Sequence, residues 1–331
     1  MPREVLLLRR EEVGRVLDMA SCIDAVEAAF AAYSQGRAEL PSVIHLDVPE
    51  HQGEIHVKAG HLHGVPHYAV KVASGFYEAD LPAIDGLVLV FDATTGAPEA
   101  FLLDDGLITD VRTGAAGGVA ARYLAPSTVG RVAIAGTGQQ ARQQLEALAC
   151  VRPGFGSVAV WGRNPERVQS CVEDLRVRSW LPEGCLVEGA ETVQAALEGA
   201  DVVLTCTASR EPLVRAEWLA PSVHVTAIGS DGADKQELDV GVLGGADLVV
   251  VDGRTQATAI GELHHAVNAG RLLPEDTVEL GEIVAGERVG RTDDHQRTVC
   301  DLTGIGVQDV AAAAVVLERA RSLGLGETLR L

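Results

Sequence analysis

The sequence predicts an α/β protein of two domains, one with a doubly wound parallel sheet and a second of the α+β type. Its 331 residues are enough for two domains of ordinary size. From about residue 130 to 300, short apolar runs alternate with helical stretches, which is typical of a parallel sheet. Before residue 104, strand-like runs follow one another without helices between them, which indicates a mostly antiparallel sheet.

The N-terminal part begins with a predicted helix at 21–36. Apolar side chains recur there at helical spacing, with Ser21 as its N-cap and Gly36 as its stop signal. The segment 92–96 predicts a hairpin turn between two strands. The strands expected in this part are 43–48, 54–59, 67–73, 87–92 and 99–103.

The remaining elements divide into the alternating region and one terminal helix. The Ala-rich helix predicted at 307–322 needs a surface to pack on, and we expect it to return to the N-terminal part. This gives one domain of residues 1–116 plus 305–331 and another of residues 117–304. The alternating elements expected are 131–135, 139–150, 157–161, 165–175, 192–197, 201–206, 223–228 and 247–251.

Composition excludes several kinds of partner. The net charge of −20 argues against nucleic acid and against anionic membrane surfaces. Six scattered cysteines without a C-x-x-C pair argue against a disulfide framework. The first residues contain only a four-residue apolar run between charges, so we expect no signal peptide or membrane anchor. These features predict a soluble, cytoplasmic protein.

A glycine-rich turn follows the strand at 131–135 and opens the next helix. Its pattern is G-x-G-x-x-A, in which the first glycine permits the tight turn and the second lets backbone approach a pyrophosphate. The final alanine allows close packing of helix on strand, and the helix N-terminus favours phosphate. The run therefore predicts a dinucleotide site in a Rossmann-type domain, made of Gly136, Thr137, Gly138, Gln139, Gln140 and Ala141.

Other strand ends supply further candidates for the cofactor site. No acid follows the strand at 157–161 to bind a ribose 2′-hydroxyl, and Arg163 and Asn164 stand there instead. An arginine there suits a 2′-phosphate, so NADP(H) is favoured and NAD(H) is possible; the alternative is a solvated loop arginine. Thr207, Ile228 and Gly229 lie at carboxyl ends of predicted strands, where ligands bind in open α/β sheets. The alternative for Thr207 is a hydroxyl in water.

Three charged or capping residues could carry chemistry beside the cofactor. Asp231 follows a strand end and could exchange a proton with a substrate amine, or could simply cap a turn. Arg112 and Thr113 precede a small-residue stretch, so we expect them at a helix N-terminus, with Thr113 as a candidate cofactor contact. An arginine there is poorly placed for the helix dipole but well placed to hold a carboxylate.

Cationic residues also recur on the predicted strands. Lys71 shares a face with small residues, which leaves room for a ligand, although an exposed lysine on an edge strand has the same pattern. His56 and Lys58 share a face of another strand. Six of the ten histidines lie from His45 to His67, but no cysteine or carboxylate pattern completes a metal site, so no metal is expected.

Taken in order, these motifs form a familiar set. The chain resembles the ornithine cyclodeaminase/μ-crystallin family over nearly its whole length. The resemblance rests on Lys71, residues 107–115, Gly136–Ala141, Ile228–Asp231, Lys235–Leu238, Gly261–Leu263 and Gly304–Asp309.

The resemblance implies a homodimer and a division of labour between the domains. Residues 1–116 plus 305–331 would form the substrate and dimerisation domain, and residues 117–304 the Rossmann domain. Family members use residues matching Lys71 and Arg112 to hold a substrate carboxylate. The residue matching Asp231 acts on the substrate amine.

The chain departs from the family pattern at two points. Residues 41–45 lack an arginine that family members often carry after a proline, and Lys58 stands where many have proline. A cation is therefore lost at one place and gained at another. His45, His56 and Lys58 become candidates for contacting a second polar group of the substrate, such as the second carboxylate of iminosuccinate.

The sequence supports three functional hypotheses. The first is an NAD(P)H-dependent imine reductase, equivalently an amino-acid dehydrogenase, acting on a small 2-imino acid. Lys71 and Arg112 would hold the carboxylate, and Asp231 with Lys71 would handle the nitrogen proton. The second is ornithine cyclodeamination to proline. The third is a non-catalytic NADP-binding protein similar to μ-crystallin.

Overall fold

The computed structural model describes residues 4–76 and 84–330 and divides into two compact units. Unit 1 comprises residues 1–112 and 305–331, and unit 2 comprises residues 113–304. Helix α3 (Leu107–Leu124) contains the division, between Arg112 and Thr113.

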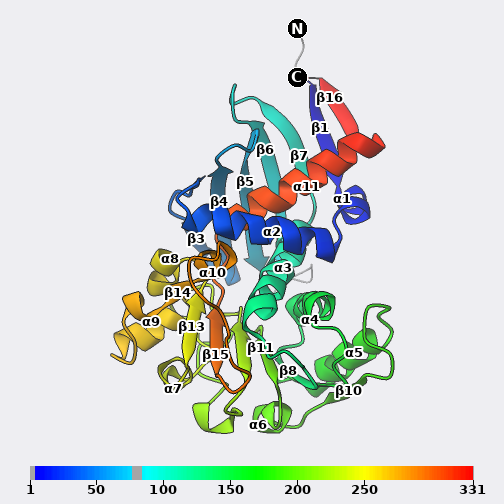
Figure 1. The fold of residues 1–331 in the computed structure, drawn as a ribbon. Coiled ribbons are helices and arrows are strands. Elements are labelled where there is room, and N and C mark those ends of the chain that lie inside the picture. Colours follow the sequence, from blue (N-terminus) through cyan, green and yellow to red (C-terminus); the bar gives the residue numbers. More distant parts are fainter. Residues whose placement is uncertain (1–3, 77–83, 331) are drawn as a thin grey trace. The chain divides into compact units, whose positions relative to one another are not determined.

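Unit 1 is built on a mixed sheet with the strand order β16-β1-β7-β6-β5-β4-β2, and β3 pairs with β4 (Figure 1). All pairs are antiparallel except β1 with β7, so the expectation of a mostly antiparallel sheet is confirmed. The turn at 92–96 joins β6 to β7, as predicted. The strands are β1 (Glu4–Arg9), β2 (Ala38–Glu39), β3 (Ile44–Val48), β4 (Gly53–Leu62), β5 (His67–Phe76), β6 (Ile84–Asp92), β7 (Pro98–Leu103) and β16 (Glu327–Arg330).

The helices of unit 1 pack on one face of this sheet. Helix α11 (Val307–Leu323) lies against α2 (Met19–Ser34) and against β4, β5 and β6 (Figure 1). The prediction that Ser21 is the N-cap of the helix expected at 21–36, which is α2, is wrong. Asp18 is the N-cap, and its carboxylate accepts from the Ser21 backbone N–H at 2.9 Å, since an ionised side chain is the stronger acceptor. The shorter elements are α1 (Arg10–Val16) and the 3₁₀ turn η1 (Pro49–His51).

Unit 2 is built on an all-parallel sheet, which confirms the predicted doubly wound fold. The strand order is β10-β9-β8-β11-β12-β15-β13-β14. Strand β15 inserts between β12 and β13, and the sequence reading did not include it as a strand. The strands are β8 (Arg131–Ala135), β9 (Ser157–Trp161), β10 (Leu186–Gly189), β11 (Val202–Thr205), β12 (His224–Ala227), β13 (Leu248–Val251), β14 (Val278–Glu279) and β15 (Thr298–Asp301).

Two apolar layers cover the two faces of this sheet. Side chains of α3, α4 and α5 pack on one face, and those of α6 to α9 pack on the other. Each strand contributes alternate residues to the two layers, as the period of two requires. The helical elements are α4 (Gln139–Val151), α5 (Pro165–Arg176), α6 (Val193–Leu197), η2 (Ala216–Trp218), α7 (Val240–Gly244), α8 (Arg254–Ala259), α9 (Gly261–Asn268), η3 (Pro274–Asp276) and α10 (Leu280–Val284).

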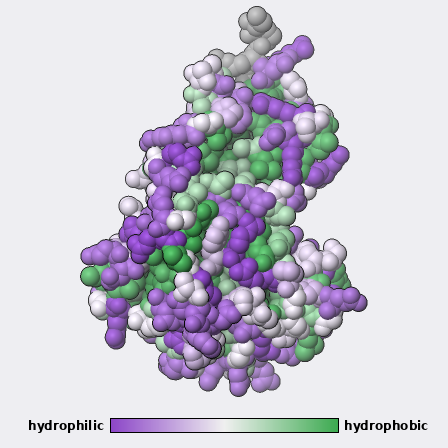
Figure 2. All heavy atoms as spheres, in the orientation of Figure 1, coloured by the Kyte–Doolittle hydropathy of each residue, from purple (hydrophilic) through white to green (hydrophobic). Residues whose placement is uncertain are grey.

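Hydrophilic side chains are spread over the face drawn in Figure 2, in keeping with the net charge of −20. Within the described part of the chain, no helix is both long and apolar enough to cross a membrane.

Candidate active site

Unit 1 buries a cluster of cations around one carboxylate. Lys71 Nζ lies 3.1 Å from Asp309 Oδ1, and Arg112 Nε donates to the same oxygen at 2.9 Å. Arg112 Nη1 donates to Gln308 Oε1 at 2.8 Å. Lys71, Arg112 and Asp309 are 2%, 4% and 2% exposed, so these charges lie out of water. One carboxylate oxygen thus serves two cations.

Sheet register brings Lys58 to the same place. Lys58 of β4 is directly opposite Lys71 of β5 in an antiparallel pair, so both side chains project from the same face. Helix α11, which carries Asp309, packs on β4 and β5. Because β5 lies between β4 and β6, the alternative of an exposed lysine on an edge strand is wrong for Lys71.

Burial and mutual repulsion control the protonation of this cluster. Burial lowers the pKa of Lys71 to about 7, with the charges of Arg112 and Lys58 acting in the same direction and Asp309 opposing them. Burial alone would raise the pKa of Asp309, but Arg112, Lys71 and Lys58 hold it below its ordinary value. Lys71 can therefore gain or lose a proton near neutral pH, while Asp309 stays ionised.

The expected position of Arg112 and Thr113 at a helix N-terminus is wrong. Helix α3 begins at Leu107, so both residues lie inside it. Asp104 accepts from the Ile108 backbone N–H at 2.6 Å and supplies the buried carboxylate at the start of the helix. Arg112 therefore reaches Asp309 from the side of the helix, and a ligand there would meet its guanidinium rather than free backbone N–H groups. The Thr113 carbonyl accepts from Gln144 Nε2 at 2.8 Å within unit 2.

The candidate histidines lie on the same sheet face as the lysines. His56 is two residues from Lys58 on β4, and His45 on β3 is directly opposite His56. Their rings pack edge to face with centroids 4.7 Å apart. His56 Nε2 lies 3.8 Å from a Glu54 oxygen, and an Asp47 carboxylate oxygen accepts from Nε2 of the exposed His45 at 2.9 Å. No group of three potential metal ligands occurs among residues 4–76 and 84–330.

In unit 2 the glycine-rich turn has the geometry that a dinucleotide needs. Gly136 has φ +134°, and a Cβ on it would lie 2.5 Å from Cys206 Sγ, so a side chain is excluded. Gly138 is the N-cap of α4, and among the described residues that are not its neighbours along the chain, no atom lies within 4 Å of where its Cβ would be. The turn therefore combines an exposed helix N-terminus with open space beside it, which fits a pyrophosphate.

Arg142 of α4 holds this turn by binding its backbone carbonyl groups. Its Nη1 donates to the Thr137 and Gly138 carbonyls, each at 2.9 Å. Holding the carbonyls on one side leaves the opposite side of the turn for N–H groups, which is the polarity that a phosphate requires. The sequence reading missed Arg142, although an arginine directly after Ala141 was a usable signal.

The end of β9 presents the residues expected to select the nucleotide. Arg163 is exposed. The Asn164 side chain is engaged, because its Oδ1 caps α5 by accepting from the Glu166 and Arg167 backbone N–H groups at 2.8 and 3.1 Å. Arg163 is therefore available to an added phosphate, whereas Asn164 shapes the helix start.

The carboxyl ends of β11 and β12 are joined by a buried glutamate that the sequence reading did not single out as functional. Glu237 accepts from the backbone N–H groups of Thr207 and Gly229 and from the Thr207 hydroxyl. The Thr207 hydroxyl therefore points to protein rather than to water. Ile228 donates its backbone N–H to the Thr205 carbonyl at 3.0 Å.

Asp231 lies in the loop that follows β12. Its Oδ1 accepts from Lys235 Nζ at 2.7 Å, and its side chain remains 42% exposed while that of Lys235 is 8% exposed. Asp231 therefore forms an ion pair with Lys235, whereas the alternative expectation was that it caps a turn. The exposed carboxylate is accessible to a ligand group that carries a proton.

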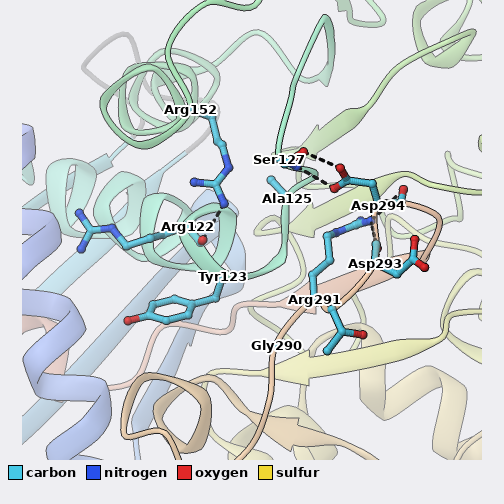
Figure 3. Close-up of a pocket in the computed structure, with 10 residues that line it drawn as sticks. Arg122, Tyr123, Ala125, Ser127, Arg152, Gly290, Arg291, Asp293 and Asp294 are labelled. Atoms are coloured by element: carbon cyan, nitrogen blue, oxygen red, sulfur yellow. Dashed lines mark hydrogen bonds between the residues drawn. The ribbon is translucent and has the colours of Figure 1, made fainter.

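A separate cavity of about 460 Å³ in unit 2 lies at the amino ends of the parallel strands, opposite their carboxyl ends (Figure 3). It is lined by residues that precede strands, including Arg152 before β9 and Arg291 before β15. Both guanidinium groups donate to backbone carbonyls, as in Arg152 Nη2 to Arg122 O at 2.7 Å. Ligands of open α/β sheets bind at carboxyl ends, so this cavity is not the nucleotide site.

Asp309 is a further site residue to which the sequence analysis assigned no role. It belongs to the family pattern, and a carboxylate within an Ala-rich helix is a signal for a buried ion pair.

Comparison with known sequences and structures bears on the whole chain. Residues 3–324 match the Ornithine cyclodeaminase/mu-crystallin family. The chain belongs to this family. Its fold, an all-parallel sheet plus a mixed sheet, is that of other members of known structure.

Relatives carry the names of several related enzymes. An uncharacterized cyclodeaminase of Sinorhizobium fredii is 39% identical over 323 residues, which cover 96% of this chain and 95% of the relative. Alanine dehydrogenase of Archaeoglobus fulgidus is 37% identical over 334 residues, 99% of this chain and 98% of the relative. Iminosuccinate reductase of Paracoccus denitrificans is 30% identical over 331 residues, 99% of this chain and 100% of the relative.

Two solved structures resemble the whole chain. An archaeal alanine dehydrogenase dimer with bound NAD has a TM-score of 0.90 at 35% identity, covering 99% of both chains. Delta(1)-pyrroline-2-carboxylate reductase of Thermococcus litoralis, in complex with NADH and L-proline, has a TM-score of 0.92 at 30% identity. That match covers 98% of this chain and 100% of the other.

Proposed function

We propose that the protein is an NAD(P)H-dependent imine reductase, equivalently an amino-acid dehydrogenase, that acts on a small 2-imino acid. The observation that carries this proposal is the buried cluster of Lys58, Lys71 and Arg112 around Asp309. Buried cations are costly unless anions compensate them, and here one carboxylate oxygen contacts two of them. A substrate carboxylate would bring a second negative charge to these three cations.

In this proposal Arg112 and Lys71 hold the substrate carboxylate. Among the described residues, Arg112 uses Nε and Nη1 for Asp309 and Gln308, which leaves Nη2 to donate to a ligand oxygen. An anion beside Lys71 would raise its pKa from about 7, so the lysine would become fully charged when substrate binds. Asp309 fixes both cations in place before the substrate arrives.

The residues of unit 2 fit a dinucleotide, which when bound would supply a hydride to the imine carbon. The glycine-rich turn, whose Thr137 and Gly138 carbonyls are held by Arg142, would bind its pyrophosphate. Reduction of an imine also requires one proton on nitrogen. We assign its delivery to Asp231, whose exposed carboxylate would take a proton up from water and pass it to the nitrogen, with the Lys71 ammonium as a second proton donor. Lys235 keeps the Asp231 carboxylate in place.

We favour NADP(H) over NAD(H) for this chain. No acid stands at the end of β9, and Arg163 is exposed beside the N-terminus of α5. A 2′-phosphate would gain a charge-assisted hydrogen bond there, whereas a free 2′-hydroxyl would find no carboxylate partner. The solved relatives named above bind NAD and NADH, so this preference is specific to the chain in hand.

A substrate panel read by nicotinamide absorbance tests the proposal. Purified protein is given each imino acid, formed from its keto acid and ammonia or supplied as a cyclic imine, with NADH and NADPH in separate series. Consumption of reduced cofactor with at least one imino acid is expected, and faster with NADPH. Ammonia release from ornithine without net change in cofactor would instead favour cyclodeamination. Nucleotide binding without any turnover would favour a non-catalytic protein.

We also infer that the protein is a homodimer; the archaeal alanine dehydrogenase is a dimer. The sheet face opposite Lys71 is apolar. Ile44 and Leu46 of β3 are 62% and 56% exposed and are paired with Val57 and Ile55. Val72 continues the same face on β5. A second copy would bury these side chains, which water otherwise contacts. Sedimentation of the intact protein measures its mass directly.

A further inference from the structure

The carboxylate of Glu237 is buried between two strand ends of unit 2. It is 0% exposed. Oε2 accepts from the Thr205 hydroxyl at 2.7 Å and from the Gly229 backbone N–H at 2.8 Å. Oε1 accepts from the Thr207 backbone N–H at 2.6 Å and from the Thr207 hydroxyl at 2.8 Å. One side chain thereby links the carboxyl end of β11 to that of β12.

Each oxygen of Glu237 accepts one hydrogen bond from a backbone N–H, which can only donate, and one from a threonine hydroxyl. Both oxygens must therefore act as acceptors toward the backbone. Burial raises the pKa of Glu237, and the Thr207 and Thr205 donors act against that rise. Glutamine has the same shape, but in either orientation its amide nitrogen would face a backbone N–H, which can only donate, so one of these two N–H groups would lose its acceptor.

The carboxyl ends of β11 and β12 approach each other so closely that a side chain at Gly229 would not fit. A Cβ on Gly229 would lie 2.0 Å from the Thr207 carbonyl oxygen and 2.6 Å from the Glu237 carboxyl carbon. The backbone N–H groups at this junction need acceptors, which neither strand ladder supplies once the strands end. Glu237 provides them and so determines the path of the backbone at Thr207 and Gly229.

A second buried acid anchors Glu237 itself. Glu262 of α9 is 1% exposed and accepts from the backbone N–H groups of Glu237 at 2.7 Å and Leu238 at 3.0 Å. The loop that carries Asp231 is therefore held at its beginning through Gly229 and at its end through residues 237 and 238. Within the loop, Lys235 Nζ donates to Asp231.

We propose that Glu237 is a positioning residue: it holds the backbone of Thr207 and Gly229, and the base of the Asp231 loop, in the form that receives the nicotinamide half of the cofactor. The inference rests on the proposed function, because it takes the carboxyl edge of this sheet as the nucleotide site. An apolar side chain at position 237 would leave the Thr207 and Gly229 N–H groups without their acceptor. The acid instead fixes polar backbone groups at the edge where ligands bind.

The experiment compares Glu237→Gln with Thr205→Val and with Val203→Ala as a matched control. Val203 lies on the same strand, is fully buried and belongs to the apolar layer, so its truncation weakens the core but keeps the carboxylate network. Dissociation constants for NADH and NADPH are measured by nucleotide fluorescence without substrate. Thermal midpoints and, where substrate is known, kcat and KM are measured in parallel.

We expect Glu237→Gln to weaken nucleotide binding at least tenfold and Thr205→Val two- to fivefold. Val203→Ala should lower the thermal midpoint and leave nucleotide binding within twofold of the wild type. If a folded Glu237→Gln protein binds nucleotide as the wild type does, the inference is wrong. Should that variant not fold, Thr205→Val decides, and unchanged binding there overturns the inference.

The binding readout separates this inference from the proposed function. A wild-type protein that binds nucleotide but reduces no imino acid would refute the proposed function, while the loss on Glu237→Gln would still support the positioning role. A wild-type protein that binds neither NADH nor NADPH would overturn both.

Discussion

Replacing Lys71 by methionine should stabilise the protein while removing substrate affinity. The pKa of Lys71 is lowered from 10.5 to about 7, mainly by burial. At about 1.4 kcal/mol for each pKa unit, keeping this lysine in the folded protein costs about 4 kcal/mol at pH 7. Methionine keeps the stem of the side chain and removes the charge. Asp309 loses one donor, which costs about 1.5–3 kcal/mol, so a net gain of about 1–3 kcal/mol is expected.

The pH dependence gives the sharper test. Between pH 7 and 10.5 the unfolded chain holds a proton on Lys71 that the folded chain has released. The unfolding free energy of the wild type therefore rises with pH across this window. Lys71→Met lacks this contribution, so its advantage over the wild type should shrink by about 2 kcal/mol from pH 7 to pH 9.

Reversible urea unfolding at fixed protein concentration, followed by circular dichroism, which reports both units, measures this difference at each pH. Subtracting the two proteins cancels the groups that they share. A difference that stays constant from pH 7 to pH 9 would refute the assignment of a depressed pKa to Lys71. The same variant should raise KM for the imino acid about 100-fold, as expected for the loss of a charged hydrogen bond.

Four further substitutions test individual roles. Lys58→Ala should raise KM for a dicarboxylic imino acid about tenfold more than for a monocarboxylic one, measured by steady-state kinetics. Arg163→Ala should reduce kcat/KM for NADPH about tenfold and leave that for NADH within twofold, and equal losses would contradict the 2′-phosphate role. Asp231→Asn should lower kcat about 100-fold with nucleotide binding unchanged, as expected for loss of a proton-transfer group. Val57→Glu should convert the dimer to monomers in sedimentation, because it places a charge on the apolar sheet face.

Local patterns in the sequence predicted the fold well. The period of two placed Lys71 with small residues on one face of a strand, and the sheet register adds Lys58 to that face. The glycine pattern placed the turn between β8 and α4. These signals concern neighbours in the chain, which sterics and hydrogen bonding determine locally.

Partners distant in the sequence could not be predicted in this way. Arg112 meets Asp309 across 197 positions, and only the packing of α11 on the sheet of unit 1 brings them together. The start of α3 was misjudged for a related reason. Asp105 and Gly106 both have positive φ, so a turn delivers the chain to a helix that begins five residues before Arg112. Small residues after Thr113 resembled a helix start but continue an existing helix.

The two units bury ionisable side chains in different ways. The contrast indicates that the cations of unit 1 are the groups that bind a ligand. In unit 2 the buried acids Glu237 and Glu262 accept hydrogen bonds from backbone and hydroxyl groups of their own unit. Their carboxyl oxygens are hydrogen-bonded within the protein, so they can fix its structure without a ligand. In unit 1 Lys71 and Arg112 share one oxygen of Asp309, and the lysine is held near its titration point. A folded protein tolerates that arrangement at a cost in stability, and an anionic substrate would recover the cost on binding.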